Sequence, residues 1–190
     1  MTFSDWEQCV RPKVQGTWNL HQATSSAGLD FFLLLSSICG ITGQPAQSNY
    51  NSANTFLDAF VNYRHGQNLP ASVVDIGLMG CTGIMVRENR ALNQKLMASG
   101  YYFLNEQELF DALTIAITYS RPEKDMLMNK SQLGLGLRST KPMTDPSTRV
   151  AWKKDARMAI SHRFESLGIK TDDEARQCLQ SAFQGRKSSP

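Results

Sequence analysis

The stretch FFLLLSSICGITGQPAQSNYNSAN, residues 31–54, decides how the chain is organised. Its first part, FFLLLSS (residues 31–37), is an unbroken apolar run too short to cross a membrane, which is typical of a strand buried on both faces of a parallel sheet. Open α/β sheets bind ligands at the carboxyl ends of their strands, so we expect Ser36 and Ser37 at that rim.

A Gly-rich loop and then a helix follow this strand. The glycines and the proline of GITGQP (residues 40–45) predict that regular structure stops, with Ser48 as the N-cap of a helix that runs to about His65. Tyr50 and Asn54 are four residues apart, so they share one face of the first turns, nearest the serines. A hydroxyl, a phenol and an amide are therefore expected to converge.

The residues before this stretch predict a helix on the sheet. The pattern S-x-x-E, from Ser4 to Glu7, is a capping box, and Pro12 is expected to break or kink the helix before a second helical run from Lys13. Apolar residues recur at helical spacing in that second run, which gives a face able to pack on strands.

Two later apolar runs predict further strands, at Ala71–Ile76 and at Gln132–Leu137. Between them, GLMGCTGIM (residues 77–85) is interpreted as a Gly-rich turn, and Asn105 is expected to cap a helix that stops before Pro122. The alternation of strands and helices predicts an α/β fold with one parallel sheet.

Beyond Arg138 the composition shifts to Ser, Thr, Lys and Pro, which is typical of a linker. WKKDARMAISHRFES (residues 152–166) and TDDEARQCLQSAF (residues 171–183) predict short amphipathic helices, and QGRKSSP (residues 184–190) predicts a disordered end. We therefore expect one domain segment over residues 1–138 and a linker and tail over residues 139–190.

Composition excludes several classes of protein. The 190 residues are 41% apolar and 19% charged, which suits a globular protein, and 20 basic against 17 acidic residues give a net charge of only +3, so neither nucleic acid nor a membrane is expected as a partner. The four cysteines are far apart, and free thiols are favoured over disulfides or a metal site. MTFSDWEQ (residues 1–8) does not resemble a signal peptide, so a cytoplasmic location is expected.

Each candidate residue also has a plainer interpretation. Tyr50 could be half-buried packing, Ser36 or Ser37 could be strand-end hydrogen bonders, Asn54 could cap or bridge locally, and Lys13 could be a solvated charge. Only the combination of their separations favours a shared function.

Those separations resemble the ketoreductase domain of modular and iterative polyketide synthases. Ser37 follows Lys13 by 24 residues, Tyr50 follows Ser37 by 13, and the frame GxxGxPxQxxYxxxN continues to Asn54. Ordinary short-chain dehydrogenases carry Lys four residues after the Tyr, where this chain has Asn54. PKVQGTWNLH (residues 12–21) adds to the likeness, and WKKDARM (residues 152–158) is similar to fungal highly reducing synthases.

The resemblance implies the C-terminal part of a Rossmann-type sheet and NADPH-dependent reduction of the β-ketone of a carrier-bound acyl chain. It implies that Tyr50 donates the proton, that Lys13 lowers the pKa of that phenol, and that Ser37 hydrogen-bonds the ketone, with Ser36 as the second choice. Asn54 would orient Lys13 or a water in the proton path.

The resemblance also implies a cofactor surface. The residues expected to bind the nicotinamide end of NADPH are Lys13, Tyr50, Gly77, Met79 and Gly80. Residues 77–85 would cover the nicotinamide, and residues 85–103 would form a lid over the acyl chain. Ile76 stands where many relatives carry Trp.

The family's dinucleotide-binding half would precede residue 1, and GLGL (residues 134–137) does not replace its glycine loop. The partners implied are an acyl carrier protein, the remaining half of the ketoreductase domain and other synthase domains. The alternatives are a catalytically inactive remnant and a scaffold piece without cofactor binding. We expect the chain alone not to reduce a β-ketoacyl thioester and to expose an apolar strand edge.

Overall fold

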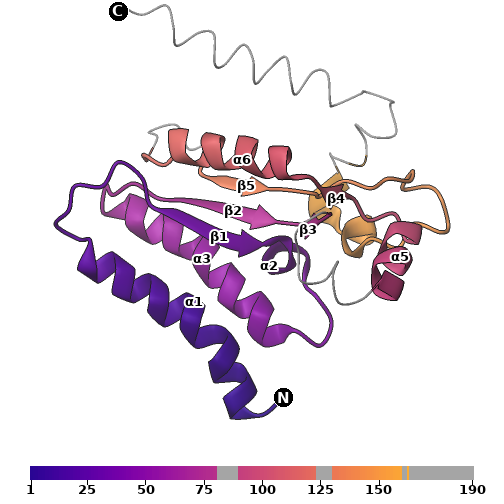
Figure 1. Ribbon diagram of the computed structural model, residues 1–190, viewed down its shortest axis with the longest axis horizontal. Coiled ribbons are helices and arrows are strands. Elements are labelled where there is room, and N and C mark those ends of the chain that lie inside the picture. Colours follow the sequence, from indigo (N-terminus) through magenta and orange to yellow (C-terminus); the bar gives the residue numbers. More distant parts are fainter. Residues whose placement is uncertain (81–89, 123–129, 160–161, 163–190) are drawn as a thin grey trace, which may run out of the picture.

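The computed structural model describes residues 1–80, 90–122, 130–159 and 162. A three-stranded sheet lies between helices on its two faces (Figure 1). In chain order the described elements are α1 (Phe3–Ala23), β1 (Leu33–Ser37), α2 (Ile38–Thr42), α3 (Ser48–Gly66), β2 (Ser72–Ile76), β3 (Leu78–Met79), α5 (Arg90–Ala98), β4 (Phe103–Leu104), α6 (Glu106–Thr118), β5 (Gln132–Gly134) and the 3-10 helices η1 (Ala151–Lys154) and η2 (Ala156–Met158).

The sheet is parallel and has the strand order β1-β2-β5. Leu34 lies opposite Val73 and Ser36 lies opposite Asp75, so these four side chains project from the same face. The expected parallel α/β fold and its three strands are therefore confirmed, although β5 ends at Gly134 and is shorter than expected. The carboxyl ends of β1 and β2 meet at one edge, which places Ser37 next to Ile76.

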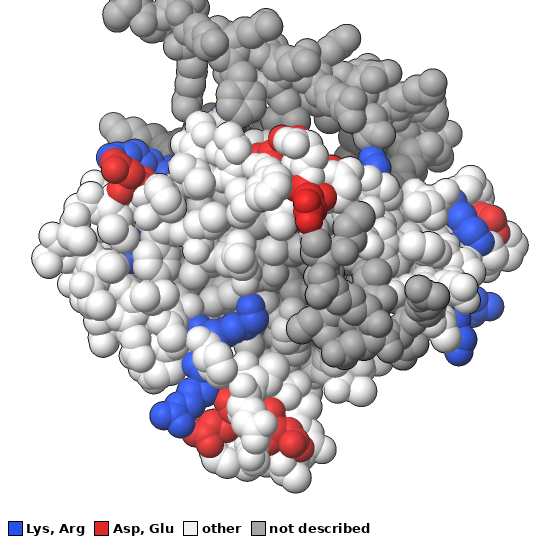
Figure 2. Space-filling model, in the orientation of Figure 1, with Lys and Arg blue, Asp and Glu red and all other residues white. Residues whose placement is uncertain are grey.

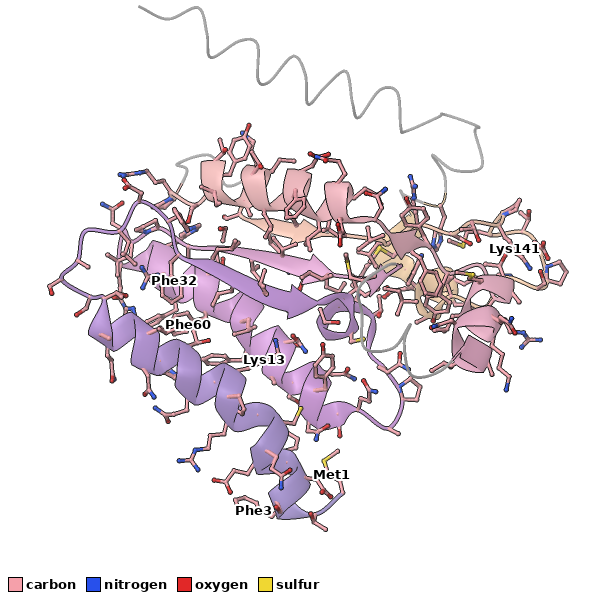
Figure 3. All side chains as sticks on the ribbon, in the orientation of Figure 1. Met1, Phe3, Lys13, Phe32, Phe60 and Lys141 are labelled. Atoms are coloured by element: carbon pink, nitrogen blue, oxygen red, sulfur yellow. The ribbon has the colours of Figure 1, made fainter. Side chains whose placement is uncertain are left out.

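Two apolar cores hold the layers together. The core between the sheet and α3 consists of buried Phe32, Leu34, Leu57, Phe60, Val61, Ala71 and Val73. Figure 3 shows Phe32 and Phe60 in this layer, with ring centroids 6.4 Å apart. On the other face Val74 packs against Ala112 and Ala116 of α6. α1 packs against α3, and its Trp18 contacts the same core.

The expectation that β1 is buried on both faces is wrong. Leu35 is 52% exposed and Phe31 is 46% exposed. In the described part of the chain β1 pairs only with β2, and α6 covers β2 and β5 but leaves the Leu35 side of β1 bare. An unbroken apolar run does not by itself reveal which of its residues a neighbouring layer will cover.

Helix starts differ from those expected at the N-terminal side. α1 begins at Phe3 because Thr2 and Asp5 form a reciprocal capping box, so the Ser4–Glu7 box is not used. Pro12 lies inside α1 without ending it, since the helix packs on α3 over its length.

The other caps give a mixed outcome. α3 begins at Ser48 itself rather than after it, and no side chain caps it. The box formed by Asn105 and Glu108 at the start of α6 is confirmed. Within GLMGCTGIM, Leu78–Met79 forms β3 and pairs with β4 instead of belonging to a plain turn.

The segment expected to be a linker packs against the sheet rim. Val150 and Trp152 form a buried cluster with Ile38, and Tyr101 packs edge-on against Trp152 with centroids 5.5 Å apart. Residues 152–158 form 3-10 turns rather than an amphipathic α-helix. The expected helix at residues 171–183 and the disordered end lie outside the described residues, as do Cys81 and Cys178, whereas Cys9 and Cys39 are free thiols.

Charged side chains on the visible face of the molecule do not gather into one patch of a single sign. On the face in Figure 2 basic and acidic side chains are scattered, often side by side, over a mainly uncharged surface. None of the helices in the described ranges is both long and apolar enough to cross a membrane.

Replacing Trp152 with Ala tests whether residues 139–159 are part of the folded unit. Trp152 is 1% exposed, so Trp152→Ala should lower the free energy of unfolding by about 3–5 kcal/mol. Trp6 on α1 is 37% exposed, and the control Trp6→Ala should cost less than about 1 kcal/mol. Urea unfolding followed by circular dichroism measures both, and equal small effects would mean that the segment behaves as a linker.

Candidate functional site

A cavity of about 820 Å³ lies at the carboxyl ends of β1 and β2. Lys13 of α1, Ser37 at the end of β1 and Tyr50 of α3 all line it. Its volume is in the range that holds small molecules and cofactors. Three of the four residues expected to be catalytic therefore share one cavity wall, although they come from three elements.

Lys13 reaches the sheet from α1. Its Nζ donates a 2.9 Å hydrogen bond to the carbonyl oxygen of Leu35, on the edge of β1 that no described strand pairs with, and Figure 3 shows the side chain directed from α1 toward the sheet. Burial lowers the pKa of Lys13, while the nearby Cys9 and Asp58 act in the opposite direction. The ammonium group is thus held close to the cavity by a backbone contact.

Ser37 and Ser36 have different contacts. The Ser37 oxygen accepts a 3.3 Å hydrogen bond from the backbone N–H of Cys39 and so caps α2. That bond uses a lone pair, so the hydroxyl hydrogen can be donated to a ligand in the cavity. The Ser36 hydroxyl donates to the carbonyl oxygen of Asn54 on α3. Both serines line the cavity, but this difference favours Ser37 as the donor.

α2 is the element that the sequence did not predict, and it fixes Ser37. Gly40 was expected to stop regular structure, yet it lies inside α2. A Cβ on Gly40 would be 3.2 Å from the Cβ of Asn54 and 3.2 Å from the backbone nitrogen of Thr55. The glycine therefore lets α2 lie close against α3, next to the turn that carries Tyr50.

Asn54 is placed differently from the expectation. Its side chain is fully buried and does not line the cavity. The amide Nδ2 donates a 2.8 Å hydrogen bond to the carbonyl oxygen of Tyr50, one turn earlier, and its Oδ1 has no hydrogen-bond partner. Asn54 contacts neither Lys13 nor the cavity directly, so it acts on the backbone that carries Tyr50.

Only some of the residues expected to bind a cofactor line the cavity. Gly77 and Met79 line the cavity, and Gly80 does not. A Cβ on Gly77 would be 2.6 Å from the carbonyl oxygen of Leu135, and one on Gly80 would be 3.2 Å from that of Leu104. Neighbouring backbone therefore explains both glycines. Residues 81–89, which include part of the expected cover and lid, lie outside the described residues.

Several wall residues were not singled out from the sequence, although three of them, Leu92, Leu96 and Tyr101, lie within residues 85–103, the segment expected to form a lid. Leu92 and Leu96 of α5 line the cavity, as do Tyr101, Ala151 and Trp152. The spacing of the two leucines is a signal for a helical apolar face, but the part played by Trp152 has no local signal, since it depends on how a distant segment folds back. The backbone N–H of Ala151 donates to the Tyr101 hydroxyl at 3.1 Å, which ties that segment to the wall.

Comparison with known proteins relates this chain to polyketide synthases. The KR domain family model matches residues 1–80. The chain is 43% identical over 197 residues to the highly reducing polyketide synthase g433 of a Fusarium species, a match that covers 100% of the chain and 8% of the synthase. It is 50% identical over 169 residues to the synthase lcsB of Purpureocillium lilacinum, covering 86% of the chain and 7% of the synthase. The chain thus spans less than a tenth of these relatives.

Solved structures give the same picture. The first ketoreductase of the tylosin polyketide synthase is 34% identical, with a TM-score of 0.52 over 60% of this chain and 24% of that one. A-type ketoreductases from a modular polyketide synthase give a TM-score of 0.62 at 24% identity, over 73% of this chain and 27% of that one, which supports the fold alone.

Replacing Gly40 with Ala tests the close approach of α2 to α3. Gly40→Ala should lower the free energy of unfolding by about 1–2 kcal/mol, because the new methyl group overpacks the contact with Asn54 and Thr55. The matched control is Gly16→Ala in α1, where a Cβ meets nothing within 4 Å, and it should stabilise the chain by about 0.5–1 kcal/mol. Urea unfolding gives both values, and stabilisation by both variants would contradict the packing described.

Proposed function

We propose that this chain, whose residues 1–80 match the KR domain family model, forms the catalytic wall of an NADPH-dependent β-ketoacyl reductase of the polyketide synthase type. The substrate class is a β-ketoacyl chain held on an acyl carrier protein, and the product is the β-hydroxyacyl chain. The observation that carries the proposal is that Lys13, Ser37 and Tyr50 line one cavity at the carboxyl ends of β1 and β2.

The chemistry needs hydrogen-bond donors at the ketone oxygen. When bound, NADPH supplies the hydride, and the ketone oxygen gains negative charge as the hydride arrives. Ser37 donates its hydroxyl hydrogen to that oxygen, and Tyr50 donates the proton that converts it to an alcohol. The ammonium of Lys13 lines the same cavity as Tyr50.

The residues present suit the nicotinamide end of NADPH. The ammonium of Lys13 and the hydroxyl of Tyr50 are donors of the kind that ribose hydroxyls accept, and Gly77 and Met79 give the cavity a wall that a flat ring can lie against. The apolar side chains of Leu92, Leu96 and Trp152 suit an acyl chain. The remaining half of the ketoreductase domain and other synthase domains complete the proposed set of partners.

A second candidate function is a scaffold piece without catalysis. The observation that favours it is the open edge of β1, where Leu35 is exposed and Lys13 donates a hydrogen bond to a backbone carbonyl. An unpaired apolar strand edge is a surface for association. The experiment on Tyr50 separates the two candidates.

Tyr50→Phe should lower the rate of ketone reduction by at least about 10²-fold, because the variant loses only the proton-donating hydroxyl. The measurement uses a highly reducing synthase such as lcsB in which this segment replaces its own, with NADPH oxidation and β-hydroxyacyl product both followed. The matched control is Tyr63→Phe on the same helix, 43% exposed and not part of the cavity wall, which should stay within about twofold.

Two results would contradict the proposed enzyme. Turnover by the Tyr50→Phe variant within a few-fold of the unaltered segment would require another acid. A correctly folded chimera that binds NADPH but never reduces the ketone, with Tyr50 intact, would favour the scaffold.

A further inference from the structure

Two carboxyl groups near the end of β1 take no part in the steps above. Asp58 comes from α3 and Asp75 from β2, and the Asp75 side chain is fully buried. Asp58 interacts with both Asp75 and Ser36. Asp75 lies opposite Ser36 in the β1–β2 register, so the group sits on the sheet face that α3 covers.

If both carboxyl groups are ionised, some of their buried oxygens have no hydrogen-bond partner. Gln132 Nε2 of β5 donates to Oδ2 of Asp75 at 2.9 Å. Oδ1 of Asp58 and Oδ1 of Asp75 are both buried, and neither has a hydrogen-bond partner. Two ionised carboxylates close together repel each other and can offer only acceptors, whereas a proton held between them supplies a donor.

A metal ion is the other usual counter-charge for such a pair. Across residues 1–80, 90–122 and 130–159, no three His, Cys, Asp or Glu side chains are arranged to hold one. The charged groups that face the pair come from α1, where Lys13 lies close enough to interact with Asp58 and Cys9 interacts with Lys13. A shared proton is therefore the way of reducing the charge of the pair that fits these neighbours.

We propose that Asp58 and Asp75 hold one proton between them, and that the single negative charge left on the pair keeps the Lys13 ammonium charged and positioned at the cavity. They are positioning residues that act through Lys13, and through Ser36 on the strand end. This inference rests on the proposed function of Lys13, but the shared proton itself does not depend on that function.

The directions of the pKa shifts of Asp58 and Lys13 agree with this proposal. Burial and the neighbouring Asp75 raise the pKa of Asp58 to about 7, against smaller opposing effects of Ser36 and Lys13. Burial lowers the pKa of Lys13, and the charge of Asp58 opposes that change. A negative charge beside a partly buried ammonium favours its protonated form.

The stability of the chain should therefore depend on pH in a specific sense. In the unfolded chain Asp58 titrates near an ordinary carboxyl pKa of about 3.9, so between that pH and about 7 the folded state holds more protons. The stabilisation from this group is complete below pH ~4 and is lost as the pH rises through about 7. Asp58→Asn mimics the protonated acid at every pH, so its unfolding temperature relative to the unaltered chain should rise from pH 5 to pH 8.

Infrared spectroscopy tests the shared proton directly on the 190-residue chain. A protonated-carboxyl C=O band should persist at pH 6 in the unaltered chain, disappear as the pH passes about 7, and be missing from Asp58→Asn. The matched control is Asp111→Asn on the exposed surface of α6, which should keep the band and the unaltered pH dependence. A chain without this band at pH 6, or one whose band survives Asp58→Asn, overturns the proposal.

The positioning role is tested in the chimeric synthase. Asp58→Asn leaves one negative charge on Asp75, so the maximal rate should stay within about threefold. The double variant Asp58→Asn, Asp75→Asn leaves none, so the alkaline limb of the rate–pH profile should move to lower pH by about one unit, since Lys13 loses its proton more easily. An unmoved limb in a folded double variant would overturn the positioning role, even if the infrared band is present. Loss of all activity in the unaltered chimera would instead count against the proposed function alone.

Discussion

The parallel pairing of β1 with β2 is the constraint on which the site depends. Because the two strands run in the same direction and in register, their carboxyl ends bring Ser36 beside Asp75 and Ser37 beside Ile76. Successive side chains of a strand point to opposite faces of the sheet. Ser36 and Asp75 therefore project toward α3, whereas Ser37 ends the strand at the cavity. A slip of one residue would exchange these faces, burying one set of contacts and exposing the other.

Two helices supply the site residues that do not lie on the strands, Lys13 and Tyr50. α1 carries Lys13 across the open edge of β1, where a backbone carbonyl holds its ammonium. A lysine on an unpaired edge also satisfies an acceptor that would otherwise be open to another chain. α3 carries Tyr50 in its first turn, and the close packing at Gly40 sets its distance from the strand end. The site is thus assembled from three elements whose positions follow from packing on one sheet.

The sequence was a good guide where local chemistry and spacing carry the information. The strands around Leu33–Ser37 and Ser72–Ile76 and the cap of α6 follow from apolar runs and a capping box, and the convergence of Lys13, Ser37 and Tyr50 followed from their separations. It was a poor guide where contacts between residues far apart in the sequence determine the local structure. Gly40 looked like a breaker, yet tertiary packing keeps it in α2, because only a residue without a side chain can approach α3 so closely.

The same reasoning explains the wall residues that lie far from Tyr50 in the sequence. Trp152 is about a hundred residues from Tyr50 in sequence, and no local pattern marks it as part of the wall that Tyr50 also lines. Its burial follows from the contact of Val150 and Trp152 with Ile38 at the start of α2, the helix that Ser37 caps. A change in that contact would therefore reach Ser37 through α2 and another part of the cavity wall through Tyr101. The wall residues Leu92, Leu96, Tyr101 and Trp152 lie beyond residues 1–80, which the family model matches, and within the whole-chain similarity to the Fusarium synthase.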